Sequence, residues 1–245
     1  MTRFAESNLR FAIVDLPPMS DDQALVDWRL EHVTSAFAAA YAPHTEIVHL
    51  DPGATDPTRL VPPSGVVAGV YAKADERRGV WKAPAGVEVT GVVGLGEDYT
   101  DSRQDLLNPN AVNVIREFPQ RGIMVWGART VSSDPEWRYV AVRRLANIIE
   151  RSVTQSTKWV VFEPNAEPLW TSVRASIGGF LFDLWREGAL QGAKPEDAFF
   201  VRVGLGETMS QSDIDAGRLI VTIGFAPLKP AEFVIVRLTH QLSGL

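Results

Sequence analysis

The chain has 245 residues, a formal net charge of −6 at pH 7 and no cysteine. An acidic chain without a long basic run lacks the electrostatic footprint of nucleic-acid binding, and a chain without cysteine has neither disulfides nor thiolate metal sites. No apolar run reaches the roughly 18 residues of a membrane span, so we expect a soluble chain that does not insert into a membrane.

The N-terminal part of the chain predicts a β-α-β start. Residues 11–14 form a short apolar run that predicts a buried strand. A capping-box pattern begins at Ser20, and apolar side chains recur at helical spacing as far as Ala40, so we expect one helix that ends at Pro43. Residues 46–50 predict the second strand, parallel to the first.

The middle of the chain is less regular. Residues 65–72 are an apolar run with two glycines, which fits a buried helix or a strand; we favour the helix because two prolines precede it. Residues 87–95 predict a strand region. Residues 112–115 and 123–126 predict two short strands separated by a turn.

The last third of the chain continues the alternation of helices and strands. Residues 133–136 again have capping-box form, and the helix that follows has an apolar face, with Arg143 on the opposite face. Residues 159–162 are entirely apolar and predict a central strand. A further amphipathic helix ends at Gly188, and residues 198–203 predict another strand. This alternation is typical of an α/β protein.

The sequence shows no catalytic or metal-binding constellation above background. His44, Glu46, His49 and Asp51 are close in sequence, but in an extended segment the first two point away from the last two, so ordinary loop or surface roles are favoured over a metal site. The glycine-rich residues 91–98 have neither dinucleotide-binding nor phosphate-binding spacing. We therefore expect no catalytic residue, no cofactor and no metal.

An α/β hydrolase stays open as an alternative. Its site would lie in loops at the strand ends and would use Ser64 or Ser176 with His44 or His49. Neither serine lies in a G-x-S-x-G turn, so this alternative is disfavoured.

The C-terminal segment holds two β-rich apolar stretches, residues 218–226 and 231–239, separated by an elbow that contains Pro227 and Pro230. We expect the first stretch to be a strand of its own domain. A strand at the end of a chain has an unpaired backbone edge, so the second stretch must be paired within its domain, shielded or donated to another molecule.

Several blocks spread over nearly the whole chain carry a family resemblance. They are VPPSGVVAGVY (61–71), GVWKAPA (79–85), NPNAVNVIR (108–116), RGIMVWGARTVSSDPEWRYV (121–140), WVVFEPN (159–165), DAGRL (215–219) and PAEFVIV (230–236). Together they resemble the C-terminal portion of the tail sheath proteins of contractile phages and of related contractile injection systems. The resemblance implies an α/β fold with a mixed sheet flanked by helices and an extended C-terminal β arm.

The resemblance also implies a domain organisation. It assigns residues 1–105 to the C-terminal part of a subtilisin-like, non-catalytic region. Residues 106–245 are then the sheath C-terminal domain, with the linking arm at about 231–245, and the whole forms one compact unit. Family subunits carry a considerable N-terminal region, including a second arm, before the strand expected at residue 11, and about ten residues precede that strand here.

The function that the resemblance implies is structural, not enzymatic. Sheath subunits polymerise as stacked six-fold rings around an inner tube and shorten to drive the tube through a target envelope. The expected partners are copies of the same chain, the inner tail tube protein and baseplate components. Assembly is expected in the bacterial cytoplasm, as part of a phage tail or tail-like particle. A non-polymerising tail or baseplate adaptor is a second alternative.

The resemblance assigns a role to the C-terminal segment. In the family, terminal arms extend into neighbouring subunits and join their sheets by strand exchange. The elbow of the arm is expected at Pro227 and Pro230. The inter-subunit arm is expected to comprise Glu232, Phe233, Val234, Ile235, Val236, Arg237 and Leu238.

Overall fold

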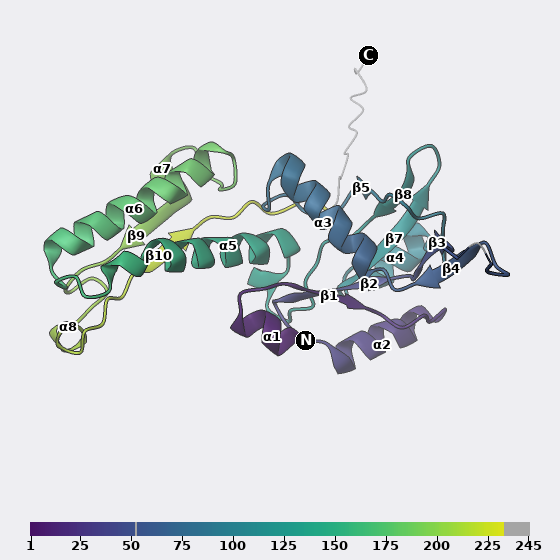
Figure 1. Cartoon of the computed structure of the whole chain (residues 1–245), viewed down its shortest axis with the longest axis horizontal. Helices are drawn as coiled ribbons and strands as arrows, with labels where there is room; N and C mark the ends of the chain where they lie inside the picture. Colours follow the sequence, from purple (N-terminus) through teal and green to yellow (C-terminus); the bar gives the residue numbers. More distant parts are fainter. Residues whose placement is uncertain (52, 233–245) are drawn as a thin grey trace, which may run out of the picture.

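The computed structural model describes residues 1–51 and 53–232. The molecule is elongated, with residues 1–139, the sheet lobe, and residues 140–225, the distal lobe, at opposite ends of its long axis (Figure 1). Helix α5 (Val140–Ser156) begins at the sheet lobe and runs into the distal lobe. Within the described residues, no helix combines the length and the apolar composition needed to cross a lipid bilayer. The division of the chain near residue 105 stays a prediction.

The sheet lobe is built on a mixed five-stranded sheet with the order β1-β2-β7-β8-β5. Strands β1 (Ala12–Asp15), β2 (Ala38–Ala42) and β7 (Val112–Phe118) are parallel. Strands β8 (Gly122–Val125) and β5 (Val87–Glu88) continue the sheet in antiparallel pairing. The strand predicted at the start of the chain and the two strands predicted around the turn are confirmed, and so is the mixed sheet of the expected fold class.

Helices cover both faces of this sheet (Figure 1). One face packs against α1 (Thr2–Ser7), α2 (Asp22–His32) and α4 (Asp101–Leu107), and the other against α3 (Ser64–Arg78) and the start of α5. Alternate residues of β2 belong to the two cores, and none of them is more than 2% exposed. Burial on both faces is typical of a strand in the parallel part of a sheet.

The predicted helix from Ser20 to Pro43 is wrong in its second half. The helix ends at His32, and four alanines and a tyrosine form β2 instead. Alanine has the highest helix propensity, but packing decides here, because the helices on both faces leave room for small side chains. The N-cap is Asp21, whose carboxylate accepts a hydrogen bond from the backbone N of Ala24 at 2.8 Å.

The strand predicted at residues 46–50 exists, but it is not the parallel partner of β1, which is β2. Strand β3 (Thr45–Val48) pairs antiparallel with β4 (Thr58–Val61) and with β6 (Gly94–Leu95) in a separate three-stranded sheet. The single strand region predicted at residues 87–95 is therefore divided between two sheets.

The helix favoured at residues 65–72 is confirmed as α3, and the alternative strand is wrong. The helix begins at Ser64 and is capped by Asp15 at the end of β1. The Asp15 carboxylate accepts hydrogen bonds from the Ser64 backbone N at 2.6 Å and from Ser64 Oγ at 2.7 Å. A carboxylate from another element thus satisfies the first turn of the helix.

The distal lobe packs two long helices against a two-stranded sheet. Helices α5 and α6 (Glu167–Arg186) share a core with β9 (Phe199–Arg202) and β10 (Thr222–Phe225), which pair antiparallel. The short helices α7 (Pro195–Ala198) and α8 (Gln211–Asp215) complete the lobe. The predicted second long helix and the two strands are confirmed.

The central strand predicted at residues 159–162 is wrong. A 3₁₀ turn, η2 (Lys158–Val160), joins α5 to α6, and Phe162 is fully exposed with a φ of 75°. Trp159 and Val161 are about half exposed, at 47% and 58%. Apolar composition alone does not separate a buried strand from an exposed loop of this length.

The start of α5 also differs from the prediction. The capping pattern at 133–136 begins a 3₁₀ turn, η1 (Pro135–Trp137), and the α-helix follows at Val140. Arg143 is buried, not exposed, because its guanidinium lies 4.1 Å from the ring centroid of Trp137 and 4.4 Å from that of Phe37. Two aromatic faces thus stabilise a charge that the helical pattern placed in solvent.

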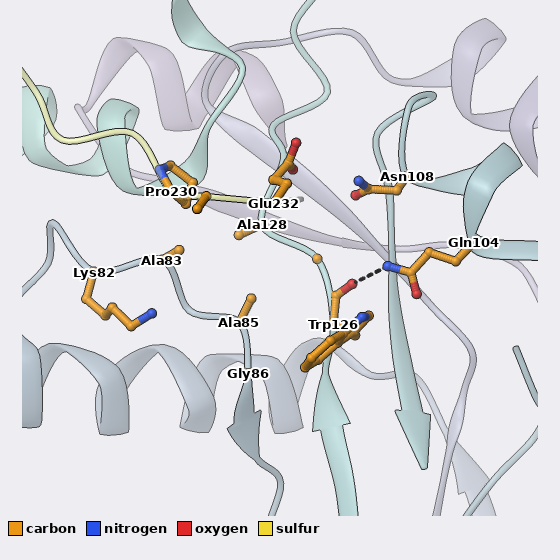
Figure 2. Close-up of a pocket in the computed structure, with 12 residues that line it drawn as sticks. Lys82, Ala83, Ala85, Gly86, Gln104, Asn108, Trp126, Ala128, Pro230 and Glu232 are labelled. Carbon is orange, nitrogen blue, oxygen red and sulfur yellow. Dashed lines mark hydrogen bonds between the residues drawn. The ribbon is translucent and has the colours of Figure 1, made fainter. Parts of the chain in front are cut away.

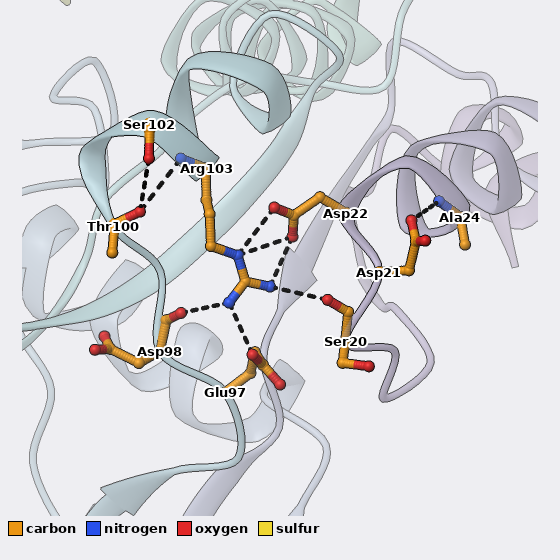
Figure 3. A network of polar contacts seen from close by, with 9 residues as sticks. All are labelled: Ser20, Asp21, Asp22, Ala24, Glu97, Asp98, Thr100, Ser102 and Arg103. Atoms are coloured by element: carbon orange, nitrogen blue, oxygen red, sulfur yellow. Dashed lines mark hydrogen bonds and ion pairs between the residues drawn. The ribbon is translucent and has the colours of Figure 1, made fainter.

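Arg103 on α4 ties three segments of the sheet lobe together (Figure 3). Its Nε and Nη2 atoms donate to the Asp22 carboxylate at 2.7 to 3.1 Å. Its Nη1 atom donates to Glu97 Oε1 at 2.7 Å and to the backbone O of Asp98 at 2.5 Å. Hydrogen bonding to Asp22 is the largest cause of the raised pKa of Arg103.

We expect Arg103→Lys to lower the free energy of unfolding by about 1 to 2 kcal/mol, because an ammonium cannot donate in the forked geometry of a guanidinium. Arg103→Gln also removes the charge and should lower it by about 2 to 3 kcal/mol. Urea denaturation followed by circular dichroism measures both losses. Arg218→Lys, at an ion pair in which the arginine side chain is 61% exposed, serves as the control and should leave the unfolding midpoint unchanged. Equal stability of the two Arg103 variants and the parent chain would contradict the role of Arg103.

Candidate functional site at the base of the C-terminal arm

After β10 the chain leaves the distal lobe and returns to the sheet lobe as an extended segment, residues 226–232, which we call the strap (Figure 1). At its start, the Ala226 backbone N donates to Ala198 O and the Ala226 O accepts from Gln191 N, each at 2.8 Å. Pro227 forms an isolated bridge with Leu190. The strap therefore begins as a continuation of the β9-β10 ladder.

The strap ends in an ion pair between Glu232 and Arg129, which are 103 residues apart in sequence. Arg129 Nε donates to the two Glu232 carboxylate oxygens at 2.9 and 3.2 Å, and Arg129 Nη2 donates to Oε2 at 2.5 Å. Arg129 Nη1 donates to the backbone O of Asn108 at 3.1 Å, and the Tyr139 hydroxyl is 3.5 Å from Glu232 Oε2. Both charged side chains are largely buried, at 10% and 17% exposed.

The electrostatics favour the charged guanidinium of Arg129. Hydrogen bonding to Glu232 is the largest cause that raises the pKa of Arg129, and burial opposes it. The Arg129 backbone is fixed as well, because its N donates to Asn113 Oδ1 at 2.7 Å and its O accepts from Asn113 Nδ2 at 2.8 Å. A forked, charge-assisted hydrogen bond on a rigid backbone holds its acceptor in one place.

Two hollows flank Glu232. The first, of about 240 Å³, lies between the strap and the segment before β5 and is lined by Ala85, Trp126 and Pro230 among others (Figure 2). The second, of about 420 Å³, lies beside α4 and includes Arg116 and Asp101, which form a salt bridge of 2.8 Å. The strap thus lies over an uneven surface, and neither hollow gathers the side chains of a catalytic site.

The β9-β10 sheet of the distal lobe has one face on α6 and one open face. On the open face the Phe200 ring lies over Gly224, where an added Cβ would come within 3 Å of three ring carbons, and the Arg202 guanidinium lies 4.7 Å from the ring centroid. Phe200 is 45% exposed. In the described part of the chain this sheet has only two strands, so it offers backbone edges for pairing.

The expected arm residues fall in two groups. Glu232 is described, and its side chain contacts Arg129 of the same chain. The other expected arm residues lie outside the described residues; they are Phe233, Val234, Ile235, Val236, Arg237 and Leu238. The elbow residues Pro227 and Pro230 lie within the strap. Their inter-subunit role stays a prediction.

The residues considered for a hydrolase do not come together. Ser64 donates to Asp15, and Ser176 lies on the exposed face of α6. The Nδ1 atom of His49 accepts a hydrogen bond from the Asp51 backbone N at 3.2 Å. Across residues 1–51 and 53–232 no serine donates to a histidine, and no group of three or more His, Asp or Glu side chains could hold a metal ion.

Sequence reasoning missed Arg129 as the partner of Glu232. The residue lies in an apolar block where nothing local marks it, since its partner is 103 residues away. The available signal was Gly127. An added Cβ there would lie 2.9 Å from the Asn113 Cα atom, which indicates close packing of the backbone that carries Arg129.

These features define an α/β protein in which the segment after β10 runs back to the sheet lobe as far as Glu232. Two family models match the chain over nearly its whole length. The model described as phage tail sheath protein central domain matches residues 3–131, and the model described as phage tail sheath C-terminal domain matches residues 132–241. The chain belongs to the phage tail sheath family.

Individual proteins agree with the family models. A putative prophage major tail sheath protein of Pseudomonas aeruginosa (strain UCBPP-PA14) is 27% identical over 95% of this chain and 58% of its own length. A sheath chain of the extracellular contractile injection system PVC, solved in the contracted state, is 41% identical with a TM-score of 0.86, over 94% of this chain and 64% of its own length. The contracted helical sheath of the anti-feeding prophage gives 41% identity and a TM-score of 0.82, over 94% of this chain and 61% of its own length.

The chain therefore spans about three fifths of the length of these relatives. The resemblance to tail sheath proteins is confirmed, together with the tail-sheath type of α/β fold. Tail sheath proteins are structural proteins, so the prediction that the chain is not an enzyme is confirmed and the hydrolase alternative is set aside.

Proposed function

We propose that this chain is the part of a contractile sheath subunit that links neighbouring subunits while the sheath shortens around its inner tube. The support is the family membership and the likeness to chains from sheaths solved in the contracted state. The proposed partners are copies of the same chain in stacked six-fold rings, the inner tube protein and baseplate components. A relative from an anti-feeding prophage baseplate supports the last of these. Assembly would take place in the bacterial cytoplasm.

The observation that carries the proposal is the path of the C-terminal segment. Strand β10 completes a ladder with β9, the strap returns to the sheet lobe, and the β-rich sequence FVIVRLT follows at residues 233–239. Val, Ile, Phe and Thr are the residues that pair best in sheets. A segment of this kind that leaves its subunit is suited to add a strand to the sheet of a neighbour.

The β9-β10 sheet is the acceptor that the geometry favours. The five-stranded sheet already has enough strands to be stable, whereas a two-stranded sheet gains most from a further strand. Partly buried apolar side chains of β9 and β10, including Val201 and Ile223, already line the α6 side. A donated strand would extend that apolar layer and cover an open edge.

The test uses donor and acceptor separately. A chain that ends at Glu232 is the acceptor, and a fluorescent peptide of residues 233–245 is the donor. We expect saturable binding by fluorescence anisotropy, and no binding of a scrambled peptide of the same composition. Val201→Pro in β9 should weaken the binding at least tenfold, because proline interrupts a strand. Equal binding of native and scrambled peptides, or no binding of either, would refute strand donation by this segment.

A further inference from the structure

We propose that Arg129 and Glu232 form a clasp that keeps the strap on its own subunit, so that the segment donated to a neighbour begins after Glu232. Donation itself rests on the proposed function. The clasp is a property of the single chain.

The clasp is strong because the Arg129 guanidinium is buried and Glu232 is its main acceptor. Arg129 as a whole residue is 8% exposed, and two of its three guanidinium nitrogens donate to the Glu232 carboxylate. Loss of the Glu232 carboxylate while the strap stays in place would leave this guanidinium with Asn108 O as its remaining acceptor in the described part of the chain. A buried charge that loses its partner is strongly destabilising. Opening the strap therefore costs more than breaking an ordinary surface ion pair.

The rest of the strap has few polar contacts of its own, so the clasp is what holds its end. Within residues 228–232, no backbone hydrogen bond connects the strap to other described segments, and Glu232 supplies the polar contacts. Pro227 and Pro230 restrict φ and remove two backbone donors, so the strap is stiff without a ladder. A stiff segment held at both ends, by β10 and by the ion pair, fixes the position from which the arm leaves the subunit.

This arrangement divides the C-terminal segment differently from its hydrophobic pattern. The pattern groups Glu232 with the β-rich stretch after it, whereas the contacts group it with the strap. Glu232 thus belongs to the subunit that carries the arm, and it fixes the position at which the arm begins.

The absence of cysteine allows the clasp to be tested on the monomer with two spin labels. Glu117→Cys on β7 and Lys229→Cys on the strap place both labels at exposed positions. Double electron-electron resonance should give a narrow distance distribution for the labelled parent chain. Adding Glu232→Gln, which keeps the shape but removes the charge, should broaden it at least twofold. Glu207→Gln, at the more exposed ion pair with Arg174, is the matched control and should leave the distribution narrow.

A broad distribution in the parent, or an equally narrow one in the Glu232→Gln chain, would overturn the clasp. A second measurement does not depend on labels. A chain that ends at Glu232 should melt at the same temperature as the full chain, and a chain that ends at Pro227 should melt several degrees lower. Equal melting of the two shortened chains would also overturn the clasp. Neither experiment requires assembly, so a failure of the peptide to bind would leave the clasp standing, and failure of the clasp would leave strand donation standing.

Discussion

Replacement of Asn113 by leucine is expected to lower the free energy of unfolding by about 3 to 5 kcal/mol, the largest loss we expect from a single substitution in this chain. Asn113 lies on β7 with 0% of its surface exposed. Its side chain donates to Ala40 O at 3.0 Å and to Arg129 O at 2.8 Å, and accepts from Arg129 N at 2.7 Å. Leucine has a similar volume but leaves these backbone groups without their partner.

Asn110→Leu is the matched control for this prediction. Asn110 is partly exposed, and its Nδ2 atom makes one hydrogen bond, to Leu106 O at 2.8 Å. Water can replace that partner, so the loss should stay below about 1 kcal/mol. Chemical denaturation of both variants and the parent at neutral pH gives the comparison. Similar losses for the two variants would show that the three hydrogen bonds of Asn113 add little.

The stability of the chain is expected to fall steeply above pH 10. Burial is the largest cause that raises the pKa of Tyr41, Tyr71 and Tyr99, in the last case to about 12. An unfolded tyrosine has a pKa of about 10, so the unfolded chain releases these protons first. The contribution of each tyrosine is complete below pH 10 and is lost as the pH rises towards the pKa of the folded state. In that pH window, each tyrosine lowers the free energy of unfolding by about 1.4 kcal/mol per pH unit.

Three such groups together predict a slope that approaches about 4 kcal/mol per pH unit above pH 10. Urea denaturation at intervals of half a pH unit measures the slope. Tyr99→Phe keeps the ring, whose centroid is 4.4 Å from the Arg103 guanidinium, and removes one titrating group. The slope should then fall by about one third. An unchanged slope in the Tyr99→Phe chain would contradict the assignment of Tyr99 to this transition.

Local chemistry predicted much of this fold, and long-range packing decided the rest. The α6 helix and the hairpin of β7 and β8 follow from apolar spacing and turn residues, which act within a few positions. The run AAAYA of β2 has the composition of a helix and becomes a strand because it lies between two helical layers. The run WVVF at residues 159–162 has the composition of a strand and lies in an exposed loop. In both places composition and tertiary environment disagree.

The candidate site was predictable only in part for the same reason. Two prolines and a β-rich end predict the elbow and the arm from the sequence itself, and these roles stay predictions. The sequence does not indicate that Arg129 is the partner of Glu232, because an ion pair between residues 103 positions apart produces no periodic pattern. In the proposed clasp, the boundary between the strap and the donated part of the segment depends on that tertiary contact.

The Arg129–Glu232 contact also closes a ring in the chain. Residues 129 and 232 are in contact at the sheet lobe, and the stretch of chain between them contains the whole distal lobe. Tension applied to the chain beyond Glu232 would therefore pass through two side chains into the central sheet and bypass β9 and β10. In the proposed function, the distal lobe would then accept a neighbour's strand without carrying this tension.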